Sequence, residues 1–122
     1  MKRNLPQLTD EKLRDLFETL CIEQGTKWNP DEFRQYKKLY FDIKEVVDEL
    51  KRRPGDARHV LIPLLTHEDW QVRLKAGINT YAIAPQEARK ALQWLRETRL
   101  EQFGAEAGFF LSGIDSGKYT PT

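Results

Sequence analysis

The sequence contains few residues suited to metal binding or redox chemistry, with one cysteine and two histidines among 122 residues. Because Cys21 is alone, the chain can form neither an internal disulfide nor a metal site built on cysteines. His59 and His67 lack the short spacing that places two ligands on one helix face. We therefore predict no metal and no other cofactor. We also expect an inert, buried Cys21 and two solvent-facing histidines at helix ends.

Long apolar runs and an excess of one charge are also missing. No stretch approaches the roughly 18 apolar residues that indicate a membrane span. Residues 1–6 carry positive charge, but no apolar run follows them, so we expect no signal peptide and a cytoplasmic protein. Twenty basic and nineteen acidic residues leave a net charge of +1. This near-neutral balance disfavours a dedicated nucleic-acid binder, because phosphate contacts need a basic excess.

Catalytic motifs are absent as well. The sequence has no glycine-rich phosphate loop and no serine nucleophile motif. Glu68 and Asp69 lie beside His67, but acid–base chemistry would require a cleft that shifts their pKa values, and a helix cap is the simpler role. We expect Arg73 to reach acidic groups of an adjacent helix pair rather than a ligand. These observations predict that the chain is not an enzyme.

The sequence is rich in helix start and stop signals, which predict an all-α fold of about five to six helices. Caps and breakers predict helices over Thr9–Gly25, Asn29–Arg53, a short segment after Asp56 containing Pro63, Asp69–Ile83, a segment from Pro85 through Leu95, and Phe103–Leu111. We expect Glu32 to complete a capping box with Asn29. No segment alternates with a period of two, so no sheet is expected. We predict an N-terminal extension over 1–8, one domain over 9–113 and a loose tail over 114–122.

The stretch His59–Leu95 resembles a HEAT repeat followed by the first helix of the next one. The residues that carry the resemblance are Leu61, Pro63, Leu64, Leu65, Asp69, Val72, Arg73, Ala76 and Gly77. With Ala84, Pro85, Ala88, Ala91 and Leu92, the whole chain resembles a small bacterial HEAT-like family of unknown function. The resemblance implies antiparallel helix pairs stacked as a short solenoid, with no activity and no catalytic residues. Thr80 departs from the repeat, which prefers leucine there.

Aromatic and apolar residues away from the predicted core faces give the main functional signal. The second helix has an apolar face formed by Phe33, Tyr36, Leu39, Tyr40, Ile43, Val46, Val47 and Leu50. Phe41 projects opposite this face, and Trp94 is displaced from the Ala88–Leu95 face of its own helix. The fourth helix carries a second stripe of Trp70, Leu74, Ile78 and Tyr81. This stripe is either buried in a central helix or exposed as a binding ridge.

These features predict a non-catalytic helical protein-interaction module, such as an adaptor or an immunity or antitoxin-type protein, which could also bind itself. The candidate contact residues are Phe41, Trp70, Leu74, Ile78, Tyr81 and Trp94, because large surface aromatics commonly anchor protein contacts. The alternative is nucleic-acid binding on a basic ridge formed by Lys37, Lys44, Lys51, Arg52, Arg53 and Arg58. Acidic residues interleave with this ridge, which favours an ordinary ion-paired surface.

Overall fold

The computed structural model describes residues 4–98 and 101–122, which contain five α-helices, three 3-10 helices and no strand. In chain order the elements are η1 (Leu5–Gln7), α1 (Asp10–Gly25), η2 (Pro30–Glu32), α2 (Phe33–Arg52), η3 (Ala57–Thr66), α3 (Trp70–Thr80), α4 (Pro85–Thr98) and α5 (Glu101–Asp115). The all-α prediction is confirmed for this part of the chain. The chain divides into two compact units, Met1–Val60 and Leu61–Thr122, which are described separately.

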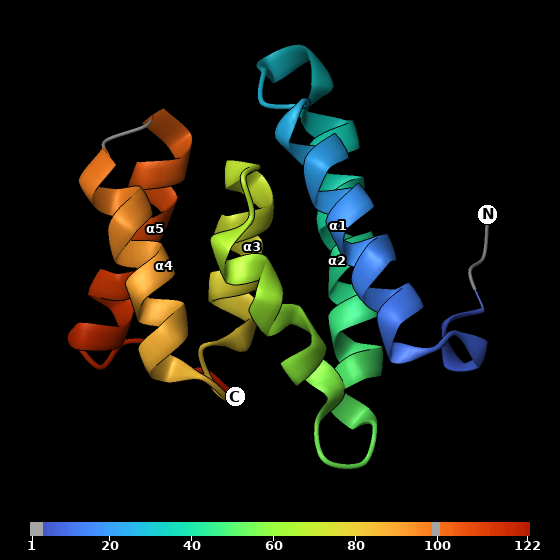
Figure 1. Cartoon of the computed structure of the whole chain (residues 1–122). Helices are drawn as coiled ribbons and strands as arrows, with labels where there is room; N and C mark the ends of the chain where they lie inside the picture. Colours follow the sequence, from blue (N-terminus) through green and yellow to red (C-terminus); the bar gives the residue numbers. More distant parts are fainter. Residues whose placement is uncertain (1–3, 99–100) are drawn as a thin grey trace. The chain divides into compact units, whose positions relative to one another are not determined.

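Unit 1 is built on the antiparallel pair α1 and α2 (Figure 1). Both predicted N-caps are confirmed. The Thr9 hydroxyl accepts from the Lys12 N–H at 3.1 Å, and the Asn29 side chain accepts from the Glu32 N–H at 3.1 Å. The capping box is wrong, because the Glu32 carboxylate accepts from the Asn29 side-chain amide instead of its backbone N–H. That backbone N–H donates to the Lys27 carbonyl, and the 3-10 turn η2 is closed by the Glu32 N–H, which donates to the Asn29 carbonyl at 3.1 Å.

The core of unit 1 uses one narrow stripe of each helix. The buried apolar residues of α1 and α2 are Leu13, Phe17, Leu20, Cys21, Leu39, Ile43, Val46, Val47 and Leu50. Phe33 and Tyr40, which the sequence placed on the buried face, are 63% and 48% exposed. The buried stripe of α2 is centred on Leu39, Ile43 and Val46, so residues at its edges receive no cover from α1. Leu5 is also buried, so the predicted N-terminal extension is partly folded; residues 1–3 lie outside the described residues.

The segment between α2 and α3 is a 3-10 helix, η3, with Pro63 inside it. Proline has no N–H to donate, which disfavours a regular α-helix at this point. Asp56 caps the start of this helix as predicted, because its side chain accepts from the N–H of Arg58, the second residue of η3, at 3.2 Å. Its backbone φ of 57° is unusual for a residue other than glycine. The predicted helix therefore exists, but with a tighter geometry.

Unit 2 contains the three helices α3, α4 and α5 around a core of Leu74, Leu92, Leu95, Ala107 and Leu111. Asp69 caps α3 as predicted, accepting from the Val72 N–H at 3.0 Å. The helix ends at Thr80, before the expected Ile83, and the buried Thr80 hydroxyl donates to the Ala76 carbonyl at 2.8 Å. All four residues predicted for the inner face of α4 are buried, namely Ala88, Ala91, Leu92 and Leu95.

The C-terminal part of unit 2 is more ordered than the sequence indicated. The last helix, α5, runs over Glu101–Asp115 and is longer than the predicted Phe103–Leu111. The tail then folds back, with the Tyr119 N–H donating to the Gly113 carbonyl at 3.1 Å. The Tyr119 ring packs edge-on against Phe110 at 5.4 Å between ring centroids. These contacts attach the predicted loose tail to α5. Among the described residues, no helix combines the length and apolar character that a membrane span requires.

Two helical glycines of unit 2 should respond oppositely to alanine. A Cβ on Gly77 would lie 2.8 Å from Cγ of the fully buried Leu92, whereas one on Gly108 would meet only the flexible Arg96 side chain at 3.3 Å. We expect Gly77→Ala to lower the free energy of unfolding by about 1–3 kcal/mol through overpacking. Gly108→Ala should be neutral or stabilise by up to about 1 kcal/mol through helix propensity. Urea unfolding measures both, and a stabilising Gly77→Ala would show that α3 and α4 pack less closely.

Candidate functional site

The apolar stripe of α3 is part of the core of unit 2. Leu74 is fully buried, and Ile78 and Tyr81 pack against the same cluster. Tyr81 also stacks edge-on against Phe110 at 5.7 Å, and its hydroxyl accepts from Arg89 at 2.9 Å. The fully buried Leu74 cannot anchor a partner, so its prediction as a contact residue is wrong. Ile78 and Tyr81 are partly buried against the same core, so of the two alternatives for this stripe the structure shows packing into the core. The reason is that α5 packs on this side of α3, and no local sequence pattern indicates that contact.

The two candidate tryptophans of unit 2 are partly exposed, at 39% for Trp70 and 42% for Trp94. Trp70 packs edge-on against Phe103 at 5.7 Å between centroids. Trp94 lies under the guanidinium of Arg73, whose central carbon is 4.1 Å from the ring centroid. Both rings therefore have packing partners, and each keeps an exposed edge.

Arg73 differs from its predicted role. Its Nε donates to the backbone carbonyl of His67 at 3.1 Å, and no carboxylate pairs with it among the described side chains. Burial lowers the pKa of the Arg73 guanidinium from its ordinary value. The sequence predicted an acidic partner, and the structure supplies a carbonyl oxygen and the face of Trp94 instead.

Unit 1 exposes a larger aromatic surface, which we call the aromatic face and define as Trp28, Phe33, Tyr36, Tyr40 and Phe41. Four of these side chains are about half exposed or more, at 53% for Trp28, 63% for Phe33, 48% for Tyr40 and 50% for Phe41. The rings contact one another edge-on, with centroids 5.5 Å apart for Trp28–Tyr36 and 5.3 Å apart for Tyr40–Phe41. Exposed aromatics in this number are unusual unless another molecule covers them.

A pocket opens at the start of α2, within the aromatic face. It has a volume of about 590 Å³, and its walls include Trp28, Pro30, Phe33 and Tyr36. Its lining is mainly apolar, which suits an aliphatic or aromatic side chain of a partner. The sequence identified Phe41 in this region but placed Phe33, Tyr36 and Tyr40 in the core. The signal that could have found them is the width of the apolar arc of α2, which exceeds what one neighbouring helix can cover.

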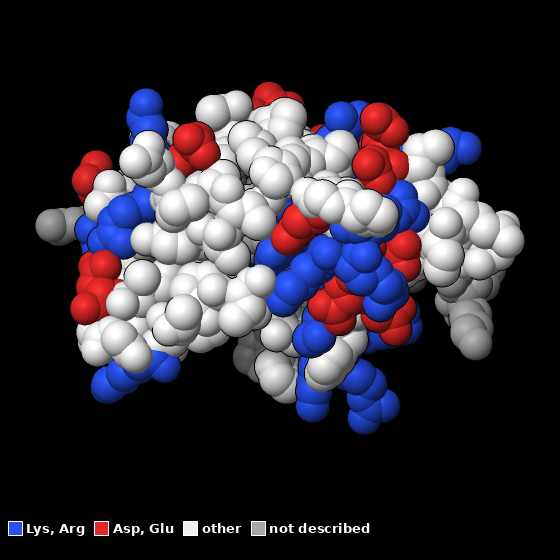
Figure 2. Space-filling view, turned by 90° about the horizontal axis from the view of Figure 1, so that it is seen from below, with Lys and Arg blue, Asp and Glu red and all other residues white. Residues whose placement is uncertain are grey.

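The predicted basic ridge is largely ion-paired. Four of its cations have carboxylate partners, with Lys44 at 2.9 Å from Asp48, Arg52 and Arg53 each at 2.9 Å from Glu49, and Arg58 at 2.6 Å from Asp56. Lys37 and Lys51 are exposed. On the face shown in Figure 2, basic and acidic side chains lie beside one another and form no continuous basic surface. Paired cations release fewer counterions from a phosphate backbone, so the arrangement is poorly suited to nucleic acid.

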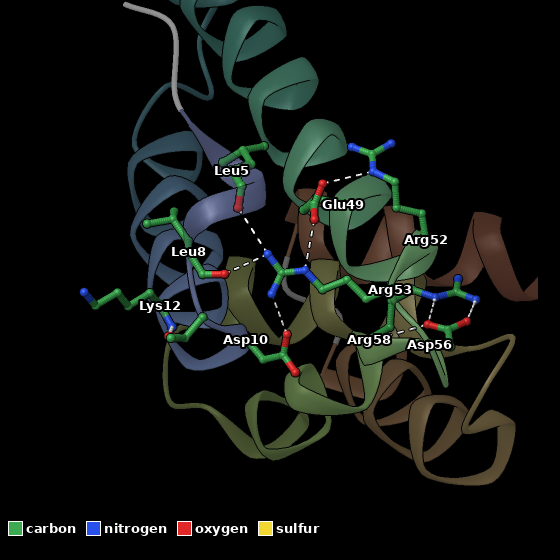
Figure 3. A network of polar contacts seen from close by, with 10 residues as sticks. Leu5, Leu8, Asp10, Lys12, Glu49, Arg52, Arg53, Asp56 and Arg58 are labelled. Atoms are coloured by element: carbon green, nitrogen blue, oxygen red, sulfur yellow. Dashed lines mark hydrogen bonds and ion pairs between the residues drawn. The ribbon is translucent and has the colours of Figure 1, made fainter.

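Arg53 is the most constrained cation of the ridge (Figure 3). Its guanidinium donates to Glu49 at 2.9 Å, to Asp10 at 2.7 Å, and to the backbone carbonyls of Leu5 and Leu8 at 3.1 and 2.7 Å. It thereby joins the end of α2 to the segment that precedes α1. The hydrogen bond from Arg53, followed by that from Arg52, lowers the pKa of the Glu49 carboxyl. Arg53 therefore has a structural role, and it is unavailable to a ligand.

The remaining candidates for chemistry have local structural roles. Cys21 is buried, as predicted, and His59 is exposed. His67 is partly buried, and its Nδ1 accepts from the Asp69 N–H at 2.9 Å, which was not expected for a solvent-facing histidine. Asp69 caps α3, as expected for the acidic pair that it forms with Glu68. Within residues 4–98 and 102–122, no group of three or more histidine, cysteine or acidic side chains is arranged to hold a metal ion.

Comparisons with known proteins give a family and a similar solved structure. The family model described as "Domain of unknown function (DUF2019)" matches residues 11–115. The chain is also similar to a solved structure, that of the protein RPA1889 from Rhodopseudomonas palustris CGA009. The two are 32% identical, with a TM-score of 0.94, over 99% of this chain and 100% of that one. A search of the curated proteins finds no match. The expected membership in a helical family of unknown function is thus confirmed in its broad form.

Removal of Arg53 should destabilise the protein strongly. The Glu49 side chain is only 6% exposed, and the Arg53 side chain only 18%. We expect Arg53→Ala to lower the free energy of unfolding by about 3 kcal/mol, near the lower end for breaking a buried pair, because Arg52 still reaches Glu49. The matched control is Arg52→Ala, whose side chain is 65% exposed and should contribute less than about 1 kcal/mol. Equal losses in the two variants would contradict the role assigned to Arg53.

The same network should make stability depend on pH. Because the pKa of Glu49 is lowered in the folded state, its contribution is complete above the ordinary carboxyl value of 4.5 and is lost as the pH falls through the folded value. We therefore expect the free energy of unfolding of the wild type to decrease as the pH is lowered from 4.5. Glu49→Gln removes the titrating group, so its stability should decline less steeply over that interval. Parallel pH profiles for the two proteins would refute the contribution of Glu49.

Proposed function

The chain belongs to the DUF2019 family, whose function is unknown, and we propose that it acts as a non-catalytic protein-interaction module. The observation that carries this proposal is the aromatic face of unit 1, where Phe33 is 63% and Phe41 50% exposed. Exposed aromatic rings lower solubility, and burying them against a partner removes their apolar area from water. Protein–protein interfaces bury such rings, and aromatic residues are enriched in them relative to the rest of the protein surface.

The shape of the aromatic face suits a protein partner better than a partner with a flat apolar surface. The pocket at the start of α2 can receive a side chain, while Tyr40 and Phe41 project from α2 and can enter pockets of the partner. Interfaces obtain most of their binding energy from a few such anchors in desolvated pockets. The proposal therefore moves the contact surface from the predicted α3 stripe to unit 1, and keeps only Phe41 from the predicted anchors as a central residue.

The charges beside the aromatic face indicate the chemistry of the partner. Arg34 and Lys37 lie on α2 between the aromatic positions, both are exposed, and neither has a carboxylate partner among the described side chains. Neighbouring Lys38 and Lys44 are paired with Asp42 and Asp48 at 3.0 and 2.9 Å. Unpaired cations next to apolar anchors favour a partner that presents carboxylates around an apolar patch. An adaptor and an immunity or antitoxin-type protein both fit this description.

Nucleic-acid binding is the less favoured alternative. Cations interleaved with aromatic rings also occur in proteins that bind single-stranded nucleic acid, where the bases stack on the rings. Against this, the net charge of the chain is +1, and much of the predicted ridge is engaged in ion pairs. Salt separates the two cases, because phosphate binding weakens steeply with salt whereas an aromatic interface changes little.

We also propose that the antiparallel pairs belong to a short HEAT-like solenoid, as the sequence resemblance implied. Support comes from the α3–α4 hairpin, in which Asp69 caps the first helix and Gly77 permits close contact with Leu92. Helix pairs of this kind leave one surface free for extended contacts with other proteins.

The aromatic face predicts which variants lose the partner. Tagged wild-type protein is incubated with nuclease-treated extract of the source organism at about 0.1 M and at about 0.5 M salt. The retained protein is identified, and its Kd for the wild type is then measured. We expect one specific partner, retained at both salt concentrations. Phe33→Ala and Phe41→Ala should each weaken Kd by about thirtyfold, the effect of losing a 2 kcal/mol anchor.

The matched control is Phe109→Ala, which removes an 84% exposed phenylalanine from unit 2. This variant should bind as the wild type does. Equal binding by all four proteins would refute the aromatic face as the contact surface. In a parallel incubation with untreated extract, retention that disappears both at high salt and after nuclease treatment would replace the proposal with nucleic-acid binding. Self-association that the two α2 variants abolish would identify a second copy of this chain as the partner.

A further inference from the structure

A second, smaller pocket lies entirely within unit 2, between the end of η3 and one side of α3 and α4. Its volume is about 340 Å³, within the lower part of the range for small-molecule sites. Ile62, Leu65 and Ala91 supply apolar walls, and Trp94 supplies an aromatic one. The charged lining residues are Arg73, Lys90 and Glu87. The pocket thus combines an apolar body with a small number of charged groups, which is the usual composition of a ligand site.

Arg73 is the group that makes this pocket unusual. Its guanidinium is partly buried and lies over the Trp94 ring at 4.1 Å, while its single hydrogen bond within the described residues goes from Nε to the His67 carbonyl. That bond and the ring hold the guanidinium in place, and among the described residues its two terminal nitrogens have no acceptor. Burial without a carboxylate lowers the pKa of Arg73, so the charge is held at a free-energy penalty. An anion in the pocket would relieve this penalty with a paired, two-pronged contact.

The other charges of the lining set the charge of the ligand. Lys90 and Glu87 are exposed on α4, and neither has an ion-pair partner among the described side chains. Together with Arg73 they leave the pocket with a single net positive charge. A group with one negative charge balances this set, whereas a phosphate dianion would leave one charge unmatched beside Glu87.

We propose that this pocket binds an organic monoanion, whose carboxylate pairs with the Arg73 guanidinium and whose apolar body lies against Ile62, Leu65 and Ala91. Trp94 holds the guanidinium from one side and forms part of the wall. Lys90 attracts the carboxylate, and Glu87 excludes ligands with more than one negative charge. The carboxylate can belong to a small acid or to the C-terminus of a peptide with an apolar last residue. This site uses no residue of the aromatic face and does not depend on the proposed partner.

The test follows the indole N–H resonance of Trp94 by NMR while the full-length protein is titrated with 3-phenylpropionate. We expect saturable binding that shifts this resonance. The alcohol 3-phenylpropanol has the same body without the charge and should bind at least about tenfold more weakly, since a charge-assisted pair is lost. Phenyl phosphate should also bind more weakly than the carboxylate. A comparison of acetyl-Ala-Leu with its C-terminal amide determines whether a peptide terminus is accepted.

Two exposed variants test the electrostatic basis without disturbing the core. Lys90→Gln should weaken the binding of 3-phenylpropionate by about twofold to fivefold, and Glu87→Gln should strengthen it by a similar factor. Changes of this size match the contribution of exposed charges. Arg73→Lys keeps the charge but loses the planar fork, and it should weaken binding by about tenfold while the fold is retained. Three results would overturn the proposal: no shift of the Trp94 resonance at millimolar ligand, equal binding of acid and alcohol, or tighter binding of phenyl phosphate.

Discussion

Each helix of this protein buries one apolar stripe, and the number of neighbouring helices decides what happens to the apolar residues outside that stripe. In unit 1, α2 packs against α1 as its main helical neighbour, so only the arc centred on Ile43 and Val46 is removed from water. Phe33, Tyr40 and Phe41 lie outside this arc and remain exposed. In unit 2, α3 contacts both α4 and α5, and Leu74 and Val72 are buried although they lie on opposite sides of the helix. The same kind of amphipathic sequence therefore gives a surface in one unit and a core in the other.

This constraint explains which features could be predicted from the sequence. Local signals were sufficient for the helix starts at Thr9, Asn29 and Asp69, because each capping side chain lies three residues from the N–H that donates to it. The inner face of α4 followed from spacing alone. Whether the α3 stripe and the α2 aromatics are buried depends on how many helices pack around α3 and around α2, which is a tertiary property. A sequence pattern gives the direction of a side chain on its helix, but not the presence of a neighbour there.

The arginines show the same division between local and tertiary information. Arg53 and Arg73 are both partly buried, and nothing in their sequence neighbourhoods distinguishes their roles. Arg53 meets Glu49 and Asp10 and becomes a fixed link within unit 1. Arg73 meets a carbonyl oxygen and an indole ring, and among the described side chains it has no acidic partner. The first has all the acceptors that it needs, while the second has donors left for a ligand. For this reason Arg53 is a poor candidate for binding nucleic acid, whereas Arg73 is a good candidate for binding an anion.

The central claim is that the aromatic face contributes to binding and not to the stability of the fold. Its most direct test is urea unfolding of Phe41→Ala beside Phe17→Ala, since both residues lie in unit 1 and only Phe17 is fully buried. We expect Phe17→Ala to lose about 3–5 kcal/mol as a truncated core aromatic. Phe41→Ala should change the unfolding free energy by less than about 0.5 kcal/mol, as a surface substitution does. A loss for Phe41→Ala comparable to that for Phe17→Ala would show that the ring is packing, and would contradict the account.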